Sequence, residues 1–276
     1  MNIPKKSSVR QTNPALTAQE AYVLKHRRHH HLITSLRILI FAVFLIIWEA
    51  AERMGLIDTF FFSSPAMVIS YFFEMFSDGS FFTHTGITLM ETLVSFLLIS
   101  LITMLAATAL WYSKTLSEIL EPYLVVLNSL PKSALAPLFI VWLGTGTDTI
   151  IVAGISVAVF GSIISLYAGF SHTDPEKLKL IYTLGGSRMD AFLKVVFPSS
   201  IPTLLSNMKV NIGLALVGVI IGEFLAARRG LGYLIIYGSQ VFKLNMVITS
   251  IIILCVIAMG LYQAIQYLEH LYKKKR

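Results

Sequence analysis

Long apolar runs separate short polar segments along this chain of 276 residues. Six runs carry few charges and approach the roughly 20 residues that an α-helix needs to cross the hydrocarbon core of a bilayer. They lie near 35–52, 87–111, 119–143, 149–170, 203–226 and 246–268. The runs are continuous rather than alternating, and a helix satisfies its backbone polar groups internally, which favours helices over strands. The pattern predicts an all-α integral membrane protein with about six transmembrane helices.

Composition agrees with this prediction. The chain is 55% hydrophobic with a mean hydropathy of +0.73, above the roughly 45–50% apolar content of a soluble domain. The single cysteine, Cys255, lies inside the last apolar run, so no disulfide framework is expected. No small-residue cleavage site follows the first run, which is therefore expected to remain as an anchor.

Lysine and arginine close to the ends of the spans predict the orientation. Basic residues flank the first span (Lys25, Arg27, Arg28, Arg37) and follow the last one (Lys273, Lys274, Lys275, Arg276). Both termini are therefore expected in the cytoplasm, although Arg228, Arg229 and Lys243 fall outside in this arrangement. The chain divides into a basic N-terminal segment 1–34, a transmembrane domain 35–270 with a cytoplasmic loop 171–202, and a basic tail 271–276.

The N-terminal segment also contains a histidine group, at positions 26, 29, 30 and 31. Without cysteine or carboxylate partners at ligand spacing, this group is a weak indication of a metal site. We interpret the segment as a juxtamembrane region beside anionic lipid headgroups, and we predict no metal site.

The third apolar run is interrupted by two prolines and several polar residues. Pro131 and Pro137 each remove a backbone donor and kink a helix, and Asn128, Ser129 and Lys132 lie beside the first kink. In one interpretation these polar groups bond neighbouring helices while Lys132 extends to the interface. In the other they line a translocation pathway in which Lys132 attracts an anion.

Glu223 lies near the outer end of the fifth run, and Gly230 and Gly232 then interrupt the helix. Glu223 is expected either to form a structural ion pair with Arg228 or Arg229, or to line the outer mouth of a pathway. In the fourth run Gly154, Ala158 and Gly161 repeat at helical spacing, which predicts close helix packing.

The loop 171–202 is predicted to contain two short helices. Asp174 before Pro175 is typical of an N-cap followed by a favoured first helical residue. Gly185 and Gly186 break this helix, and Ser187 with Asp190 resembles a capping box for the next one, which Pro198 is expected to end. The apolar faces are formed by Leu178, Ile181 and Leu184 in the first helix and by Met189, Phe192, Leu193 and Val196 in the second. From these residues alone, a protein-docking surface and a helical loop lying on the membrane remain equally open.

The same loop resembles the cytoplasmic signature loop of binding-protein-dependent ABC importer permeases. In that pattern Glu-Ala-Ala precedes a glycine, and an apolar residue, any residue, an apolar residue and a proline follow at fixed spacing. Gly185, Val195, Phe197 and Pro198 match in register, whereas Lys179, Leu180 and Ile181 stand at the Glu-Ala-Ala positions. FSSPAMVI, LPKSALAPLFIVWLGTG and GEFLAARRGLGYLI, in this order, are similar to the nitrate/sulfonate/taurine branch, over about residues 35–270.

The resemblance implies a type I ABC importer permease fold in a bacterial inner or plasma membrane. It implies a second permease subunit, as a homodimer or a related chain, two cytoplasmic ATPase subunits and an extracytoplasmic solute-binding protein. No G-x-x-x-x-G-K-[ST] phosphate loop occurs in the sequence, so ATP and Mg²⁺ are expected on the ATPase and no cofactor on this chain. No nucleic-acid partner is expected.

The resemblance also suggests residue roles and substrates. ATPase coupling is expected of Asp174, Lys179, Leu180, Ile181, Gly185, Gly186, Val195, Phe197 and Pro198, and the pathway of Asn128, Ser129, Lys132 and Glu223. The branch and Lys132 favour a small organic anion, such as an aliphatic sulfonate, taurine or a nitrate-like oxyanion. The alternative is a thiamine-precursor-like or other small nutrient.

Other classes of membrane protein are less well supported. An ion-coupled secondary transporter ordinarily needs carboxylates within the membrane, and Glu91 and Glu223 are the candidates. A membrane enzyme would need clustered nucleophiles, acids or metal ligands, and we find no such group in the sequence. A purely structural subunit would not need the capped, glycine-broken loop.

Overall fold

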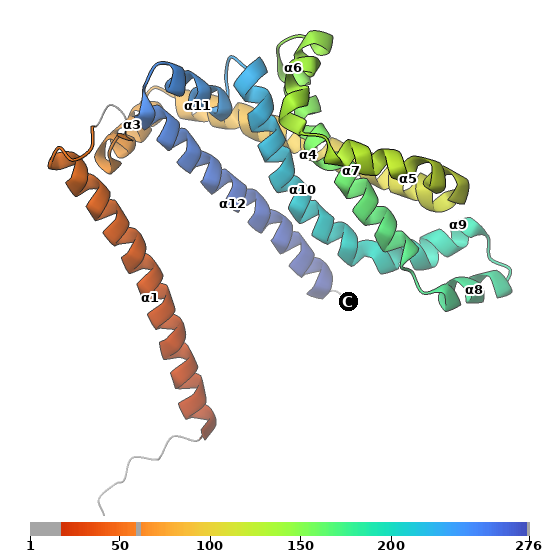
Figure 1. The fold of residues 1–276 in the computed structure, drawn as a ribbon. Coiled ribbons are helices and arrows are strands. Elements are labelled where there is room, and N and C mark those ends of the chain that lie inside the picture. The colour runs from red at the N-terminus through yellow and green to blue at the C-terminus, as the bar shows by residue number, and fades with distance from the viewer. Residues whose placement is uncertain (1–17, 59–61, 275–276) are drawn as a thin grey trace, which may run out of the picture. The chain divides into compact units, whose positions relative to one another are not determined.

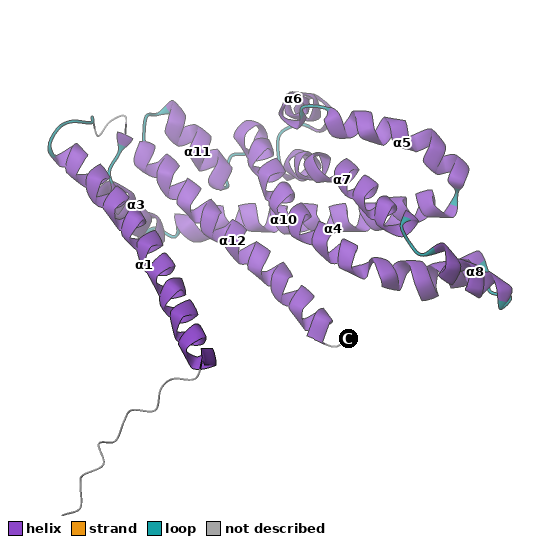
Figure 2. Ribbon diagram, turned by 60° about the horizontal axis from the view of Figure 1, so that its bottom comes forward, coloured by secondary structure: helices purple, strands orange, loops and turns teal. Residues whose placement is uncertain are grey.

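The computed structural model describes residues 18–58 and 62–274, and these are helical with short connections, as Figure 2 shows. The prediction of an all-α chain is confirmed for this part of the protein. The chain forms two compact units, Met1–Ile57 and Asp58–Arg276. Residues 1–17 of the predicted basic segment, and Lys275 and Arg276 of the predicted tail, lie outside the described residues.

The first unit contains the long helix α1 (Ala18–Arg53). Its part Leu32–Arg53 is long and apolar enough to span a membrane and includes the span predicted at 35–52. An ion pair of 2.8 Å between Glu49 and Arg53 lies in its last turns.

The second unit contains the other helices of residues 62–274, which Figure 1 shows in colours from orange to blue. They are α3 (Pro65–Ser77), α4 (Ser80–Tyr112), α5 (Lys114–Ser129), α6 (Lys132–Leu143), α7 (Thr147–Ser171), α8 (Pro175–Thr183), α9 (Arg188–Ala191), the π-helical turn η1 (Phe192–Val196), α10 (Phe197–Ala226), α11 (Leu231–Gln240) and α12 (Leu244–Lys274). Among the described residues of the whole chain, five helices can span a membrane, or six if α5 and α6 count as one span.

The predicted span 119–143 is not a single kinked helix. The chain forms α5 and α6, which are bent by 98° at Leu130 and Pro131. Leu130 adopts an extended conformation with φ −65° and ψ 139°, as expected of a residue that precedes proline. Pro131 cannot donate a backbone hydrogen bond, so the helix ends there, whereas Pro137 is accommodated inside α6.

Helix α7 is the centre of the second unit, and it packs against both α4 and α10. Its crossing with α10 is close because glycines face each other: a Cβ atom at Gly218 would lie 2.7 Å from the Cα atom of Gly154. A Cβ atom at Gly154 would in turn lie 2.6 Å from the hydroxyl of Ser95 on α4. The predicted role of Gly154 in close helix packing is confirmed.

Candidate functional site

The loop between α7 and α10 begins with a capped helix, as predicted. Asp174 accepts a hydrogen bond of 2.9 Å from the backbone N–H of Glu176, and Pro175 occupies the first turn of α8. This arrangement satisfies a donor that has no partner within the helix. The side chain of Asp174 is exposed, so the cap is built at the protein surface.

The two glycines that end α8 have different roles. Gly185 has φ +78°, and a Cβ atom there would meet no other atom within 4 Å, so its requirement is a left-handed backbone conformation. At Gly186 a Cβ atom would lie 2.6 Å from the Ile181 side chain and 2.9 Å from its carbonyl oxygen. The backbone N–H of Gly186 donates to that carbonyl at 2.9 Å. Gly185 therefore makes the turn, and Gly186 permits the close approach.

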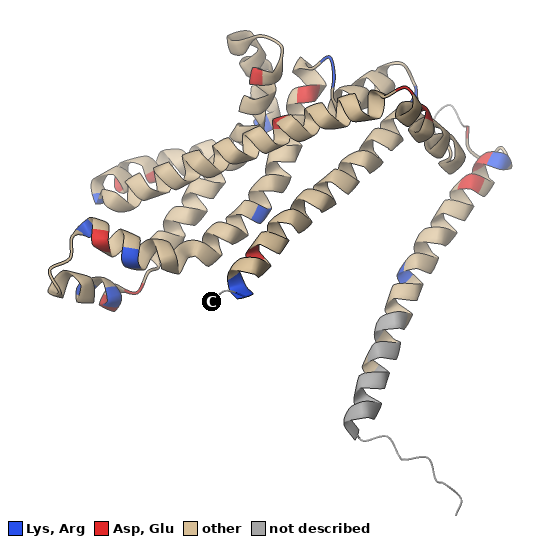
Figure 3. Ribbon diagram, turned by 180° about the vertical axis from the view of Figure 1, so that it is seen from behind, with Lys and Arg blue, Asp and Glu red and all other residues tan. Residues whose placement is uncertain are grey.

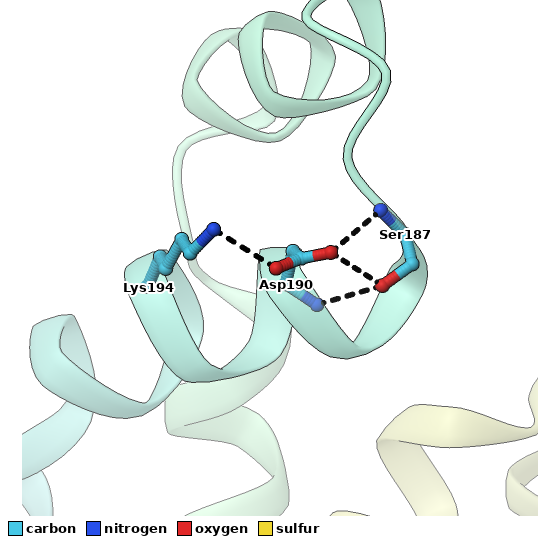
Figure 4. Close-up of polar contacts among 3 residues, drawn as sticks. All are labelled: Ser187, Asp190 and Lys194. Carbon is cyan, nitrogen blue, oxygen red and sulfur yellow. Dashed lines mark hydrogen bonds and ion pairs between the residues drawn. The ribbon is translucent and has the colours of Figure 1, made fainter.

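A capping box begins the second helix, as predicted (Figure 4). The Ser187 hydroxyl accepts a bond of 3.1 Å from the backbone N–H of Asp190, and the Asp190 carboxylate accepts one of 3.0 Å from the backbone N–H of Ser187. The same carboxylate pairs with Lys194 at 2.9 Å. Aspartate thus replaces the usual glutamate or glutamine of the box.

The prediction that Pro198 ends this helix is wrong. The chain continues from α9 through η1 into α10 as one helical segment, Arg188–Ala226. In the π turn the backbone N–H of Phe197 bonds to the carbonyl of Phe192, five residues earlier. A wider turn accommodates Pro198, which lacks an N–H and in a regular helix would clash with the carbonyl four residues before it.

Arg188 connects the loop to the end of α4. Its guanidinium donates a hydrogen bond of 3.1 Å to the carbonyl oxygen of Trp111. It also lies over the rings of Trp111 and Tyr112, at 5.4 and 5.3 Å from their centroids. A cation at the C-terminal end of a helix also complements the helix dipole. The guanidinium therefore holds the start of α9 against the last turn of α4.

The residues of the predicted apolar faces and the remaining predicted coupling residues differ in exposure. Phe192 and Val196 are buried in a cluster with Leu166 and Phe170, and Val195, Phe197 and Pro198 are partly buried. Large apolar side chains are exposed on α8 and at its end, on α9 and on η1: Leu180, Tyr182, Leu184, Met189 and Leu193. Lys179 is exposed and Ile181 is partly buried. Figure 3 shows charged residues of both signs on α8 and α9, whereas the long helices carry few charged residues. The exposed apolar side chains of Leu180, Tyr182, Leu184, Met189 and Leu193 form a surface that we call the loop surface. Charged side chains lie around it.

The polar residues beside Pro131 have local partners. Lys132 donates hydrogen bonds to the carbonyl oxygens of Leu127 and Asn128, at 3.0 Å for the latter, and lies 5.6 Å from the ring centre of Phe160. The Asn128 side chain packs against Gly161 of α7. Ser129 bonds to the carbonyl of Val125 at 2.9 Å. Lys132 therefore caps the last turn of α5, a role that neither of the two interpretations specified.

Glu223 is fully buried and does not pair with an arginine. One carboxylate oxygen accepts a bond of 2.6 Å from the Thr88 hydroxyl, and the other accepts a bond of 2.5 Å from the backbone N–H of Gly232. Among the described residues no ion pair joins it to Arg228 or Arg229. Because Gly230 and Gly232 have no side chains, the loop after α10 can close directly over this carboxylate.

Sequence reasoning missed an ion pair near the other end of the bundle. Lys209 of α10 pairs with Glu269 of α12, which also pairs with Lys273 at 3.0 Å. Lys209 and Glu269 are mostly buried, with side-chain exposures of 20% and 13%. Two opposite charges in neighbouring apolar spans were the available signal, since such residues usually pair with one another. Within the described part of the chain, no group of three or more His, Cys, Asp or Glu side chains forms a metal site.

The fold and the loop are those of a helical membrane protein with several spans and a helical loop between two of them. The family of binding-protein-dependent transport system inner membrane components matches residues 99–273. A chain of the MetNI methionine ABC transporter in an inward-facing conformation has a similar structure, with a TM-score of 0.58 and 18% identity, covering 66% of this chain and 91% of that one.

Three relatives in sequence are described as permeases, two of them with a named solute. A probable ABC transporter permease of Haemophilus influenzae is 30% identical over 84% of this chain and 94% of its own. The formylaminopyrimidine permease ThiX of Halalkalibacterium halodurans is 27% identical over 71% and 77%. The putative aliphatic sulfonates permease SsuC of Bacillus subtilis is 26% identical over 78% of each chain.

The chain belongs to the family of binding-protein-dependent transport system inner membrane components. It has the fold of type I ABC importer permeases, and it is a multi-pass inner-membrane protein. The resemblance noted in the sequence is thereby confirmed, including its nearness to sulfonate permeases.

Proposed function

We propose that this chain is the translocating subunit of an ATP-driven importer. It pairs with a second permease subunit, most simply a second copy of itself, receives solute from an extracytoplasmic binding protein, and is driven by two ATPase subunits that bind ATP and Mg²⁺. Both termini and the loop surface then lie in the cytoplasm. The observation that carries the proposal is the loop surface, a capped and tethered pair of helices with exposed apolar side chains, in a chain of this family.

The loop surface suits a mechanical role. Apolar side chains such as Leu180, Leu184 and Met189 are exposed, and burial against another protein stabilises such groups. Each of its two short helices is capped, and Arg188 joins the loop to α4. A displacement imposed by an ATPase is therefore passed to α4 and α10, and rigid-body movement of this kind is a physical route to alternating access.

The substrate is proposed to be a small organic anion such as an aliphatic sulfonate, taurine or a nitrate-like oxyanion. Similarity to SsuC supports this class. A thiamine-precursor-like solute is the second candidate, because the match to ThiX is of comparable strength. Lys132, whose ammonium is engaged by the carbonyls of α5, gives little support to an anion site there. Uptake by variants at Asn128, Ser129 and Glu223 tests the pathway roles proposed for them.

The coupling proposal is tested with substitutions at Gly185. Gly185→Asp adds a charge at the turn, and ATP-dependent uptake and co-purification with the ATPase are expected to be lost while the chain still inserts in the membrane. Gly185→Asn is the matched control, because asparagine tolerates left-handed backbone about as well as aspartate and carries no charge. Normal uptake by Gly185→Asp, or absence of any ATPase from the purified native complex, would contradict the proposal.

A further inference from the structure

The N-terminal end of α11 is capped by side chains from two other helices. The backbone N–H groups of 230–232 donate in turn to Nδ1 of His84 at 3.0 Å, to the hydroxyl of Thr88 at 2.8 Å and to the carboxylate of Glu223 at 2.5 Å. His84 and Thr88 lie on α4, and Glu223 lies on α10. The first N–H groups of a helix have no partner within it, so the start of α11 depends on these three acceptors.

A second acid lies behind this cap. Glu91, one turn along α4 from Thr88, is 1% exposed, and Glu223 is 0% exposed. The two carboxyl groups are hydrogen-bonded to each other, and Glu91 also bonds to the side chain of Thr147 at the start of α7. Among the described residues, no ion pair joins either acid to a cation. An ionised carboxylate can only accept hydrogen bonds, so the bond between the two acids requires a proton on one of them.

The other contacts indicate which acid carries the proton. Both oxygens of Glu223 accept bonds, from Thr88 and from Gly232, and the N-terminus of the ten-residue helix α11 favours a negative charge beside it. Glu223 is therefore the ionised member. Oε2 of Glu91 accepts no hydrogen bond, and a second buried charge there would lack donors and repel the first. Glu91 is therefore the neutral member.

We infer that Glu91 is a neutral carboxylic acid whose proton is shared with ionised Glu223, and that this proton holds the start of α11 against α4 and α10. Loss of the proton would place two negative charges side by side and drive Glu223 away from the N–H of Gly232. Capture of a second proton would neutralise Glu223 and weaken its bond with Gly232. The start of α11 is thus a latch whose strength depends on the proton supply, and the inference does not depend on the proposed transport role.

Infrared spectroscopy of the purified full-length chain detects this proton directly, because the C=O stretch of a neutral carboxylic acid is separate from the bands of carboxylates and of the backbone. The difference spectrum of the native chain minus Glu91→Gln, at neutral pH, is expected to contain one carboxylic-acid band that shifts in D₂O. Glu121→Gln, at an exposed position on α5, is the matched control and should give no such band. A native-minus-Glu91→Gln spectrum without the acid band would overturn the inference.

Hydrogen exchange of the amides at 230–232 measures the latch itself. Glu91→Gln keeps the shape of the side chain and a donor toward Glu223, so exchange of these amides at neutral pH should stay within about twofold of the native rate. Glu223→Gln has one acceptor oxygen in place of two, so the N–H of Gly232 loses its acceptor and exchange should be about tenfold faster. A Glu91→Gln variant that loosens the loop as much as Glu223→Gln would contradict a neutral Glu91.

A pH series separates the proton from its surroundings. The other ionisable groups at this end of the unit are His84 on α4, Arg228 and Arg229 after α10, Tyr233 on α11, Asp148 on α7 and Asp78 after α3. Between about pH 7 and about pH 10, exchange of the native amides, corrected for the intrinsic effect of pH, should accelerate about tenfold as the pair loses its proton. All of these neighbouring groups remain in Glu91→Gln, whose exchange should not accelerate.

An acceleration that survives in Glu91→Gln, or a native chain without any acceleration, would refute the latch. If Glu91→Gln does not fold, the native chain decides, because its acid band and its protection must disappear over the same pH interval. None of these measurements needs an ATPase or a binding protein, so their failure leaves the importer proposal standing, and that proposal fails separately in the co-purification test.

Discussion

Removal of the Arg188 guanidinium should free the loop surface from α4. The side chain makes one hydrogen bond to the Trp111 carbonyl and two cation–π contacts. At an exposed site a cation–π contact contributes about 0.5–1 kcal/mol and a hydrogen bond to a charged group roughly 1.5–3 kcal/mol. The lower values for the three contacts sum to about 2.5 kcal/mol. Because the site is exposed, we discount this sum for solvent screening and expect Arg188→Met to favour local opening by about 2 kcal/mol.

Hydrogen exchange measured by mass spectrometry on the detergent-solubilised chain reports this opening directly. A change of about 2 kcal/mol corresponds to roughly 30-fold faster exchange of amides near 188–196. Arg188→Lys keeps the charge but loses the planar stacking, so its effect should be intermediate. Lys179→Met, at an exposed position on α8, is the control and should leave these amides unchanged. Exchange within twofold of the native rate in Arg188→Met would refute the tether.

Three further substitutions probe the packing. Gly218→Val should destabilise the chain by about 1–3 kcal/mol, because its Cβ would meet the backbone of α7. Thermal unfolding in detergent measures this change. Gly213→Val, on the same helix but in open space, is the control and should have little effect. Gly186→Ala should disrupt the end of α8 and accelerate proteolysis there, since its Cβ would meet the carbonyl oxygen of Ile181. Gly185→Asn is the control and should leave the rate of proteolysis nearly unchanged. Lys132→Met should lower the free energy of unfolding by about 0.5–1 kcal/mol through loss of the cap on α5; unchanged stability with a loss of uptake would instead support an anion-attracting role.

Features that depend on near neighbours in the sequence could be predicted. The N-cap at Asp174 and the capping box of Ser187 and Asp190 involve groups within three residues of each other, so residue type and spacing are sufficient. The spans were predictable for the same reason, because about 20 apolar residues in succession have few alternatives to a transmembrane helix. Gly185 could be predicted as a break, although its positive φ required the structure.

Features that depend on tertiary contacts could not be predicted. The arginines adjacent to Glu223 in sequence suggested an ion pair, but Thr88, distant in sequence, and the backbone of Gly232 satisfy the carboxylate instead. Likewise, proline at 131 ends a helix whereas proline at 198 is accommodated by a π turn. The residue type is the same, and the surrounding backbone decides which outcome is reached.

The ion pair between Lys209 and Glu269 constrains the order in which this protein can be made. The two partners lie near one end of the bundle, on α10 and on α12, the last helix in the sequence. A charge that enters the apolar region without its partner is unfavourable. During synthesis α10 therefore enters the bilayer before its counter-charge exists. It must stay near the insertion machinery, or keep Lys209 at the interface, until α12 arrives. The packing of α10 is thus complete only after α12 is made, and a chain truncated before α12 would leave Lys209 without its counter-charge.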